Sequence, residues 1–183
     1  MHNGVIHNSR ELKTELEQKH RVHFRSETDT EVIVQLVGLY VDQGLSLVDA
    51  VKKTTSRLEG TWGICVVDRM DLDTIVVARN GSPMLVGIGA DAMYVASEAS
   101  AFSQHTKEYV SLENGEVAVV HASNHTLDLS RVEKAVDETI VLTPDPWPHW
   151  TLREIMEQPE SMARALNYGG RLDGDATVKL VRM

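Results

Sequence analysis

The sequence predicts an α+β fold, and three observations support this prediction. Amphipathic helix patterns fill the chain as far as Leu58, and short β-rich runs then continue as far as His121. A helical pattern returns after a proline-rich stretch at 144–148. A chain that groups its helices and its strands in this way typically forms an α+β domain with antiparallel strands.

Three helices are expected in the first third of the chain: Ser9–Lys19, Thr28–Gly44 and Ser46–Leu58. Each begins where a short polar residue precedes an acidic residue by three positions, which is the capping-box pattern. The three pairs are Asn8 with Glu11, Thr28 with Glu31, and Ser46 with Asp49. Gly44 is expected to end the second helix, because glycine is favoured just past a helix C-terminus. Between the first two helices, residues 22–24 are a short strand candidate.

The middle of the chain predicts an antiparallel meander. The expected strands are Thr61–Val67, Thr74–Ala78, Met84–Ile88, Met93–Ala96, Tyr109–Leu112 and Val117–His121. A helical turn is expected over 98–104. Asn114-Gly115 lies between the last two apolar runs, and this dipeptide is the strongest short signal for a β-hairpin. We therefore expect the last two strands to pair with each other.

A domain boundary is expected where Pro144, Pro146 and Pro148 interrupt regular structure. The sequence thus divides into a main domain at 1–143 and a linker with a helix at 144–183. The helix should begin with a capping box of Thr151 and Glu154. Pro159 is expected to break or restart that helix, and the Tyr168-Gly169-Gly170 segment is expected to end it.

Composition excludes several classes of protein. The 183 residues carry 18 Lys and Arg against 27 Asp and Glu, a formal net charge of −9. An acidic surface repels nucleic-acid phosphates, so no nucleic-acid partner is expected. No apolar run approaches the ~20 residues of a membrane helix, and no signal peptide is recognisable, so no membrane partner is expected. A single cysteine, Cys65, fits the reducing cytoplasm, which is the expected location.

Metal and thiol chemistry are not expected either. His20 and His23 are the closest histidine pair, but no cysteine or carboxylate cluster completes a ligand set. We therefore expect no metal site and no cofactor. Cys65 lies in an apolar strand pattern without an adjacent base, so it should behave as a small buried hydrophobe with a raised pKa, and not as a nucleophile.

Two polar segments have more than one interpretation. In His2-Asn3-Gly4, the Asn3 amide and the Gly4 backbone N–H are chemically suited to stabilise an oxyanion, although composition alone favours a frayed end of the chain. Asp29 either complements the start of a helix or presents its carboxylate to a ligand ammonium group. Residue spacing does not separate these alternatives.

Five segments, taken together and in order, resemble the glutaminase domain of the glutamine–fructose-6-phosphate aminotransferase family. They are His2–Asn8, Ser26–Val32, Ala78–Met84, Ala96–Ala101 and Glu154–Pro159. The segments 26–31 and 154–159 are the most specific to this family. The others are shared in part with further amidotransferases of the N-terminal-nucleophile class.

The resemblance implies a partial αββα four-layer sandwich with a C-terminal helical linker. It also implies a glutaminase that hydrolyses L-glutamine to glutamate and ammonia. By analogy, the Asn3 side-chain amide and the Gly4 N–H would form the oxyanion hole, and Asp29 would bind the α-ammonium of glutamine. Fructose-6-phosphate would be handled only by a second domain, which is absent from this sequence.

The sequence also departs from the family pattern. The family's glutaminase domain begins with a nucleophilic cysteine and includes an Arg-Trp-Ala-Thr-His-Gly type segment that grips the substrate carboxylate. Neither is present in Met1–Met183. The resemblance therefore implies a chain truncated at both ends and inactive as a glutaminase by itself. Loss of strands from a sandwich exposes sheet edges, so we also expect self-association or pairing with a chain that supplies the missing part.

Two other hypotheses remain. The chain could be a non-catalytic glutamine-binding or regulatory module of the same fold. It could also derive from another class II amidotransferase, such as the purine-synthesis enzyme, although Glu157-Gln158-Pro159 argues against this.

Overall fold

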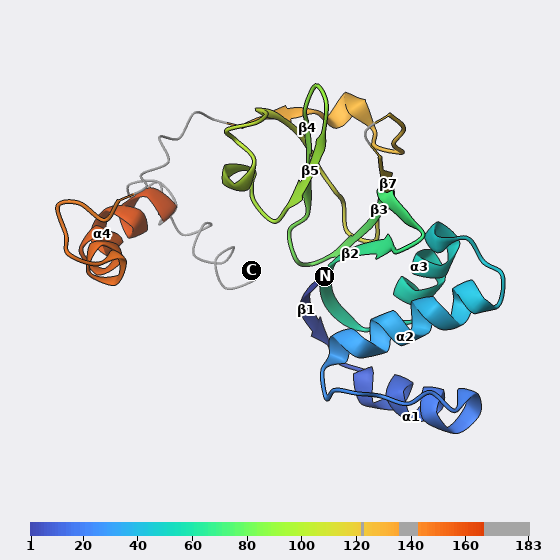
Figure 1. The fold of residues 1–183 in the computed structure, drawn as a ribbon. Coiled ribbons are helices and arrows are strands. Elements are labelled where there is room, and N and C mark those ends of the chain that lie inside the picture. Colours follow the sequence, from blue (N-terminus) through green and yellow to red (C-terminus); the bar gives the residue numbers. More distant parts are fainter. Residues whose placement is uncertain (122, 136–142, 167–183) are drawn as a thin grey trace, which may run out of the picture. The chain divides into compact units, whose positions relative to one another are not determined.

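The computed structural model describes residues 1–121, 123–135 and 143–166, and the chain divides into two compact units. The first unit spans Met1–Glu138 and the second spans Thr139–Met183. The first contains both β-sheets (Figure 1), and the described part of the second contains one helix. The expected division into functional domains at 143/144 stays a prediction.

Two antiparallel four-stranded sheets form the centre of the first unit. The first sheet has the order β1 (His2–Ile6), β2 (Gly60–Asp68), β3 (Asp71–Asn80), β7 (Val117–Val120). The second has the order β5 (Met93–Ala96), β4 (Leu85–Ile88), β6 (Glu108–Ser111), β8 (Glu133–Lys134). Strand β1 is therefore an edge strand of the first sheet, paired within that sheet with β2 alone.

Three helices cover one face of the first sheet: α1 (Ser9–His20), α2 (Asp29–Asp42) and α3 (Leu47–Thr55). Alternation along β3 shows the layers. Val76 and Ala78 lie in the core shared with the helices, whereas Val77 between them lies in the core shared with the second sheet. All three side chains are almost completely buried. The order of layers is thus helices, sheet, sheet, which confirms the predicted α+β class with antiparallel sheets.

Aromatic side chains cover the outer face of the second sheet. Since Val86 points into the core between the sheets, its neighbour Gly87 points outward. A Cβ at Gly87 would lie 2.9 Å from the ring of Phe102, which follows the short 3-10 turn η1 (Ala99–Ala101). The rings of Tyr94 and Tyr109 lie 6.5 and 6.1 Å from that of Phe102. In the described residues, this turn occupies the position of the fourth layer.

The helix signals are confirmed only in part. The Ser46 hydroxyl accepts the Asp49 N–H at 3.1 Å, which is the N-cap half of a capping box, and the Asp49 carboxylate accepts the same hydroxyl at 2.7 Å. Gly44 follows the last turn of α2 with a φ of +90°. Asn8 and Thr28, in contrast, make no side-chain cap. The Asn8 amide instead donates to the carbonyl of residue 57 at 2.9 Å and accepts the N–H of residue 59 at 3.1 Å, which ties α1 to the segment before β2.

The predicted strand at residues 22–24 is wrong. Arg21 adopts a left-handed conformation with a φ of +55° and ends α1. Val22 and Phe24 then pack against the helical core as irregular chain, without strand pairing. Their apolar character reflects burial under the helices and not a sheet.

The predicted hairpin at Asn114-Gly115 is also wrong, because β6 and β7 belong to different sheets. The turn crosses from one sheet to the other and is anchored to the end of β3. The side-chain amide oxygen of Asn114 accepts the Gly81 N–H at 2.8 Å, and the Gly115 N–H donates to the Arg79 backbone carbonyl at 2.7 Å. Turn chemistry fixes the reversal of the chain, but the partner strands β3 and β4 decide where each arm pairs. A second 3-10 turn, η2 (Leu129–Arg131), precedes β8.

Helix α4 (Trp150–Ala165) is the described helix of the second unit. It starts before Thr151, so the predicted capping box lies inside the helix, and it runs through Pro159 without a break. Proline removes one helical hydrogen bond, but Pro159 and Ile155 are exposed, so water can hydrate the freed carbonyl. The expected end at 168–170 lies outside the described residues.

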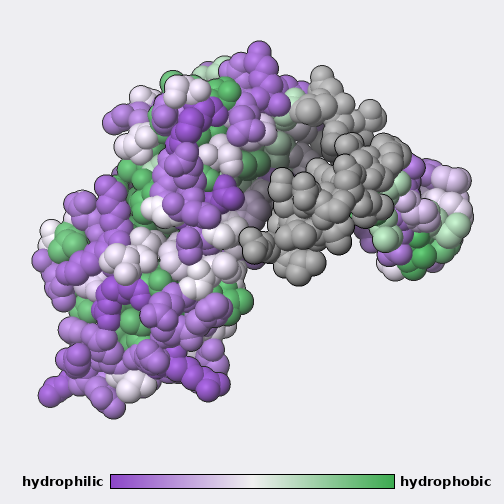
Figure 2. Space-filling view, turned by 180° about the vertical axis from the view of Figure 1, so that it is seen from behind, coloured by the Kyte–Doolittle hydropathy of each residue, from purple (hydrophilic) through white to green (hydrophobic). Residues whose placement is uncertain are grey.

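Apolar side chains are exposed on both units. In Figure 2, those on the face of the first unit that is shown are scattered among hydrophilic ones. On α4, Leu152, Ile155, Met156 and Met162 are exposed. No helix among the described residues is both long and apolar enough to cross a membrane.

Gly4 on β1 is a position at which the fold leaves no room for a side chain. Its φ is +141°, and a Cβ at this position would lie 2.0 Å from the carbonyl oxygen of Thr61 on β2. We predict that Gly4→Ala lowers the unfolding free energy by more than about 2 kcal/mol, measured by urea denaturation.

Gly38 on α2 is the matched control, because a Cβ there meets nothing within 4 Å. Gly38→Ala should raise the unfolding free energy by about 0.5–1 kcal/mol, the usual helix gain of alanine over glycine. Equal effects of the two substitutions would contradict the described packing of β1 against β2.

Candidate functional site

The open edge of β1 carries a row of backbone donors. The Met1 amino group donates to the Cys65 carbonyl at 2.8 Å, the Cys65 N–H donates back at 2.9 Å, and the His7 N–H donates to the Glu59 carbonyl at 2.7 Å. Odd-numbered residues of this segment therefore bond to β2. In an antiparallel ladder the alternate residues direct their N–H groups the other way. The N–H groups of Gly4 and Ile6 thus face the edge that β2 leaves free.

Asp29 lies against this same edge. It is the first residue of α2, and its Oδ2 accepts the Ile6 N–H at 2.8 Å. The side chain keeps 27% of its surface exposed, so part of the carboxylate remains accessible. Two residues along a strand correspond to about 6.8 Å. The structure therefore brings the Gly4 N–H and the Asp29 carboxylate to one edge, one ladder step apart.

Asn3 is exposed and points to the other face of the sheet. Alternation along β1 puts His2 and Ile6 on the face covered by helices, so the Asn3 side chain lies on the opposite face. Its ladder partner, Gly63, shows what borders that face: a Cβ at Gly63 would lie 3.3 Å from the Pro83 carbonyl oxygen. Asn3 is thus next to Gly4 in sequence but on the opposite side of β1 from the helices.

His2 is a site residue that sequence reasoning missed. Its side chain is only 3% exposed, and its Nδ1 lies 3.0 Å from the Thr30 hydroxyl and 3.9 Å from Asp29 Oδ1. Burial is the main cause that lowers the pKa of His2, and the amino group of Met1 acts in the same direction, while Asp29 opposes it. The signal available in the sequence was the alternation of β1, which puts His2 on the same face as Ile6.

Glu31 organises the loop that leads to Asp29. Its carboxylate accepts the Ser26 hydroxyl at 2.6 Å, the Ser26 N–H at 2.7 Å and the Arg25 N–H at 2.8 Å. These hydrogen bonds, with that from the Ser26 hydroxyl the strongest cause, lower the pKa of Glu31 to about 2. The acidic residue expected to complete a capping box with Thr28 therefore holds the preceding loop instead.

Cys65 has the raised pKa that the sequence indicated, although its side chain is not fully buried. It is half-buried on β2, its Sγ lies 3.9 Å from Met84 Sδ, and burial raises the pKa of its thiol. A buried thiol with a raised pKa is a poor nucleophile. His20 and His23 are exposed, and the described residues contain no group of three or more His, Cys, Asp or Glu side chains arranged to hold a metal ion.

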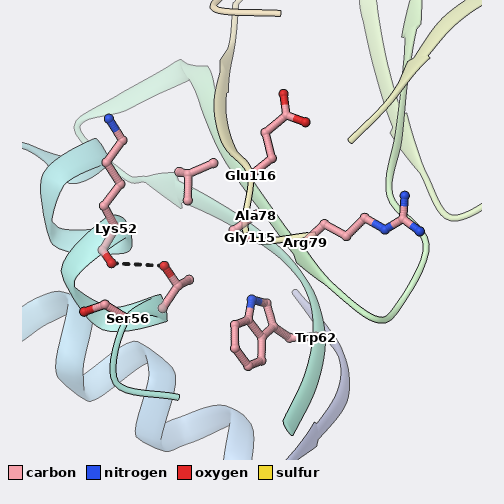
Figure 3. A pocket seen from close by; sticks show the side chains of 9 residues that line it. Lys52, Ser56, Trp62, Ala78, Arg79, Gly115 and Glu116 are labelled. Carbon is pink, nitrogen blue, oxygen red and sulfur yellow. Dashed lines mark hydrogen bonds between the residues drawn. The ribbon is translucent and has the colours of Figure 1, made fainter. Parts of the chain in front are cut away.

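Two cavities flank the first sheet at different places. One, of 190 Å³, lies beside β1 and is lined by His2 and Thr30 together with apolar side chains of α2 and β2. The other, of 350 Å³, lies between α3 and the far strands of the sheet, with Trp62 as one wall (Figure 3). In the second cavity Arg79 turns away from Lys52 and donates to Ser111 and to the carbonyl of Leu112. The polar groups that line this second cavity therefore do not converge on one point where a ligand would bind.

The layered fold and the donor-lined edge agree with what the family comparison finds. A family model described as a glutamine amidotransferase domain matches residues 1–104, more than half of the chain. The chain therefore belongs to the glutamine amidotransferase domain family.

Within that class, the relatives identify one kind of enzyme. The chain is 38% identical over 171 residues to a glutamine–fructose-6-phosphate aminotransferase (isomerizing) of Pyrobaculum aerophilum. The aligned region covers 89% of this chain and 28% of that protein. It is 39% identical over 173 residues to the protein of the same name from Geobacillus kaustophilus. Here the aligned region covers 91% of this chain and 28% of the relative. The predicted resemblance is confirmed. The chain spans less than a third of the length of these relatives.

Solved structures confirm the fold class. The glutamine phosphoribosylpyrophosphate amidotransferase of B. subtilis, complexed with ADP and GMP, superposes with a TM-score of 0.59 at 27% identity, covering 75% of this chain and 29% of that one. A structure described as the allosteric regulatory enzyme of purine biosynthesis gives a TM-score of 0.58, also at 27% identity, covering 75% of this chain and 28% of that one. The purine enzyme is thus a relative in fold, and the higher sequence identities are to the aminotransferases.

Glu31 provides a test of how the site is built. We predict that Glu31→Gln lowers the melting temperature, because an amide cannot accept all the hydrogen bonds that the carboxylate receives from Arg25 and Ser26. The wild-type chain should also lose stability as the pH falls from the ordinary value of 4.5 towards about 2, since the native carboxylate must then be protonated. The variant should lack that part of the pH dependence.

Glu27→Gln is the matched control, because Glu27 pairs with Lys13 at 3.4 Å and its side chain is 96% exposed. Exposed pairs contribute little to stability. A thermal melt in which both variants behave alike would contradict the role assigned to Glu31.

Proposed function

We propose that residues 1–138 form the glutamine-binding part of a glutamine amidotransferase site, in which L-glutamine is hydrolysed to glutamate and ammonia. One observation carries the proposal: a free backbone donor, the Gly4 N–H, and a partly accessible carboxylate, Asp29, lie along one strand edge. Glutamine has a neutral amide at one end and an ammonium group at the other. The first needs donors to its oxygen, and the second needs an anion.

The chemical roles follow from what each group offers. When a nucleophile adds to the amide carbon, the amide oxygen becomes an oxyanion, and neutral donors that are already oriented stabilise it. The Gly4 N–H is one such donor, and the Asn3 side-chain amide is proposed as the second. Because β1 is an edge strand, an exposed side chain on either of its faces can reach the space beyond the edge. Asp29 would bind the α-ammonium of glutamine through Oδ1, since Oδ2 is bonded to Ile6.

The proposal assigns no nucleophile to this sequence. The covalent route needs a thiolate, and the single cysteine of these 183 residues, Cys65, is a half-buried thiol with a raised pKa. These residues are therefore expected to bind glutamine without hydrolysing it. Transfer of ammonia to fructose-6-phosphate, a reaction proposed from the relatives' name, would need residues that these 183 do not include. The low cysteine content fits a cytoplasmic location, which is part of the same proposal.

Glutamine binding and turnover can be measured separately. We predict that calorimetry detects binding of L-glutamine to the 183-residue chain, and that an ammonia assay detects no turnover above background. Asp29→Asn should weaken binding by about tenfold or more, because it removes the charge that pairs with the ammonium group. The variant amide still has an oxygen to accept the Ile6 N–H, so the fold should persist.

Asp42→Asn is the matched control, because Asp42 is an exposed carboxylate at the other end of the same helix. It should bind glutamine like the wild-type chain. Equal affinities for the Asp29 and Asp42 variants would refute the role of Asp29, and ammonia release by the purified chain would refute the proposed lack of turnover.

Self-association is a second part of the proposal. The open edge of β1 presents unpaired backbone groups, and Val5 on that strand is 56% exposed. Open edges with exposed apolar residues pair with other chains, and an edge lysine discourages this. Light scattering should show a mass that increases with concentration for the wild-type chain and a smaller increase for Val5→Lys. A wild-type chain that stays monomeric at all concentrations would contradict this prediction.

A further inference from the structure

His2 is a buried histidine that the proposed chemistry leaves without a role. Its ring lies between β1 and the first turn of α2, with Nδ1 3.0 Å from the Thr30 hydroxyl and 3.9 Å from Asp29 Oδ1. Its Nε2 is also buried and has no hydrogen-bond partner among the described residues. A histidine that is enclosed in this way, on an edge strand beside the Asp29 carboxylate that is proposed to bind the substrate, needs a physical explanation.

Asp29 lies next to β1 at two points, of which one is a hydrogen bond and the other is a close approach. The Ile6 N–H fixes Oδ2 at 2.8 Å, and the His2 ring borders Oδ1. Thr30, next to Asp29 on the helix, is bonded to the same ring. The orientation of Oδ1, the oxygen left for a ligand, therefore depends on where the His2 ring lies.

The charge of the ring also matters for that oxygen. A neutral ring leaves the full negative charge of Asp29 available to a cationic ligand. A protonated ring beside Oδ1 would pair with the carboxylate and compete with the ligand for it. Two charged groups act on the ring, the Asp29 carboxylate and the amino group of Met1, whereas the Cys65 thiol packs against Met84 on the opposite face of the first sheet. Burial favours the neutral ring, so the competing state forms only on acidification.

We propose that His2 is a positioning residue that orients Asp29 towards the α-ammonium of an amino-acid ligand and confines strong binding to the pH range in which its ring is neutral. The proposal deepens the proposed function and rests on it, because it takes Asp29 as the ammonium ligand. His2 itself does not touch the ligand.

Three variants separate positioning from mere filling of space. His2→Asn keeps a polar group near the position of Nδ1 but does not ionise. His2→Phe fills the space and loses the bond to Thr30. His7→Asn, at an exposed histidine just beyond β1, is the matched control. Each is titrated with L-glutamine at a series of pH values between about pH 7.5 and about pH 5, the range in which histidine rings take up a proton.

The expected results differ for each chain. The wild-type chain and His7→Asn should lose about tenfold in affinity on acidification, which corresponds to the loss of one ion pair to the ligand. His2→Asn should bind at about pH 7.5 within a few-fold of the wild-type chain and show no such loss. His2→Phe should bind weakly at every pH. A wild-type affinity that does not change with pH, or a His2→Phe variant that binds like the wild-type chain, would overturn the proposal.

An NMR titration of the histidine rings separates this failure from failure of the proposed function. If Asp29 faces the ring, the pKa of His2 should be lower in Asp29→Asn than in the wild-type chain, because the opposing charge is lost. If the pKa of His2 is the same in Asp29→Asn as in the wild-type chain, the contact between His2 and Asp29 is overturned, whether or not the chain binds glutamine. A lowered pKa, in a chain that binds no glutamine at any pH, would instead overturn the proposed function and with it the role of His2 in ligand binding.

Discussion

The hydrogen bond from the Ile6 N–H to Asp29 Oδ2 joins the two parts of the molecule on which the candidate site depends. The donor belongs to the open edge of a sheet, and the acceptor is the first residue of the helix that packs on that sheet. An edge N–H without a partner would be left to water or to another chain. The bond satisfies one such donor and, in doing so, brings a carboxylate one ladder step from the next free donor, the N–H of Gly4.

Several neighbouring features support this arrangement. Glu31 gathers the backbone and hydroxyl groups of residues 25 and 26 and so fixes the loop before Asp29. Gly4 permits the close approach of β1 to Thr61 that a Cβ would prevent. His2 fills the space between strand and helix. The segments that form these contacts, β1 and α2, belong to the elements that pack on one core, in which Leu36 and Val76 are fully buried.

Local signals in the sequence predicted local structure well. The Ser46 N-cap and the end of α2 before Gly44 depend on interactions between near neighbours, and both are present, as are the strands whose period-2 pattern the sequence shows from 60 to 120. The hairpin at Asn114-Gly115 was wrong because pairing of β6 and β7 is decided by distant strands. The predicted break at Pro159 was wrong because the helix is exposed to water there, so it tolerates the hydrogen bond that proline removes.

The site was predictable in its residue types but not in its arrangement. The resemblance to the family indicated Asn3, Gly4 and Asp29 as site residues. The assignment of their roles remains a proposal. Contacts between residues 6 and 29, or 2 and 30, depend on the packing of α2 against β1, which no short pattern in the sequence encodes. For the same reason His2 was missed, although the alternation of β1 placed it on the buried face.

Amide hydrogen exchange with and without L-glutamine tests the central claim most directly. The Ile6 N–H is bonded to Asp29 and should exchange slowly in both conditions, whereas the Gly4 N–H should exchange rapidly in the free chain and become protected when glutamine is present. Protection of Gly4 that depends on glutamine, and that weakens in Asp29→Asn, is the predicted result. A Gly4 N–H that is protected without ligand, or that glutamine leaves unchanged at saturation, would show that this edge of β1 is not where the substrate amide binds.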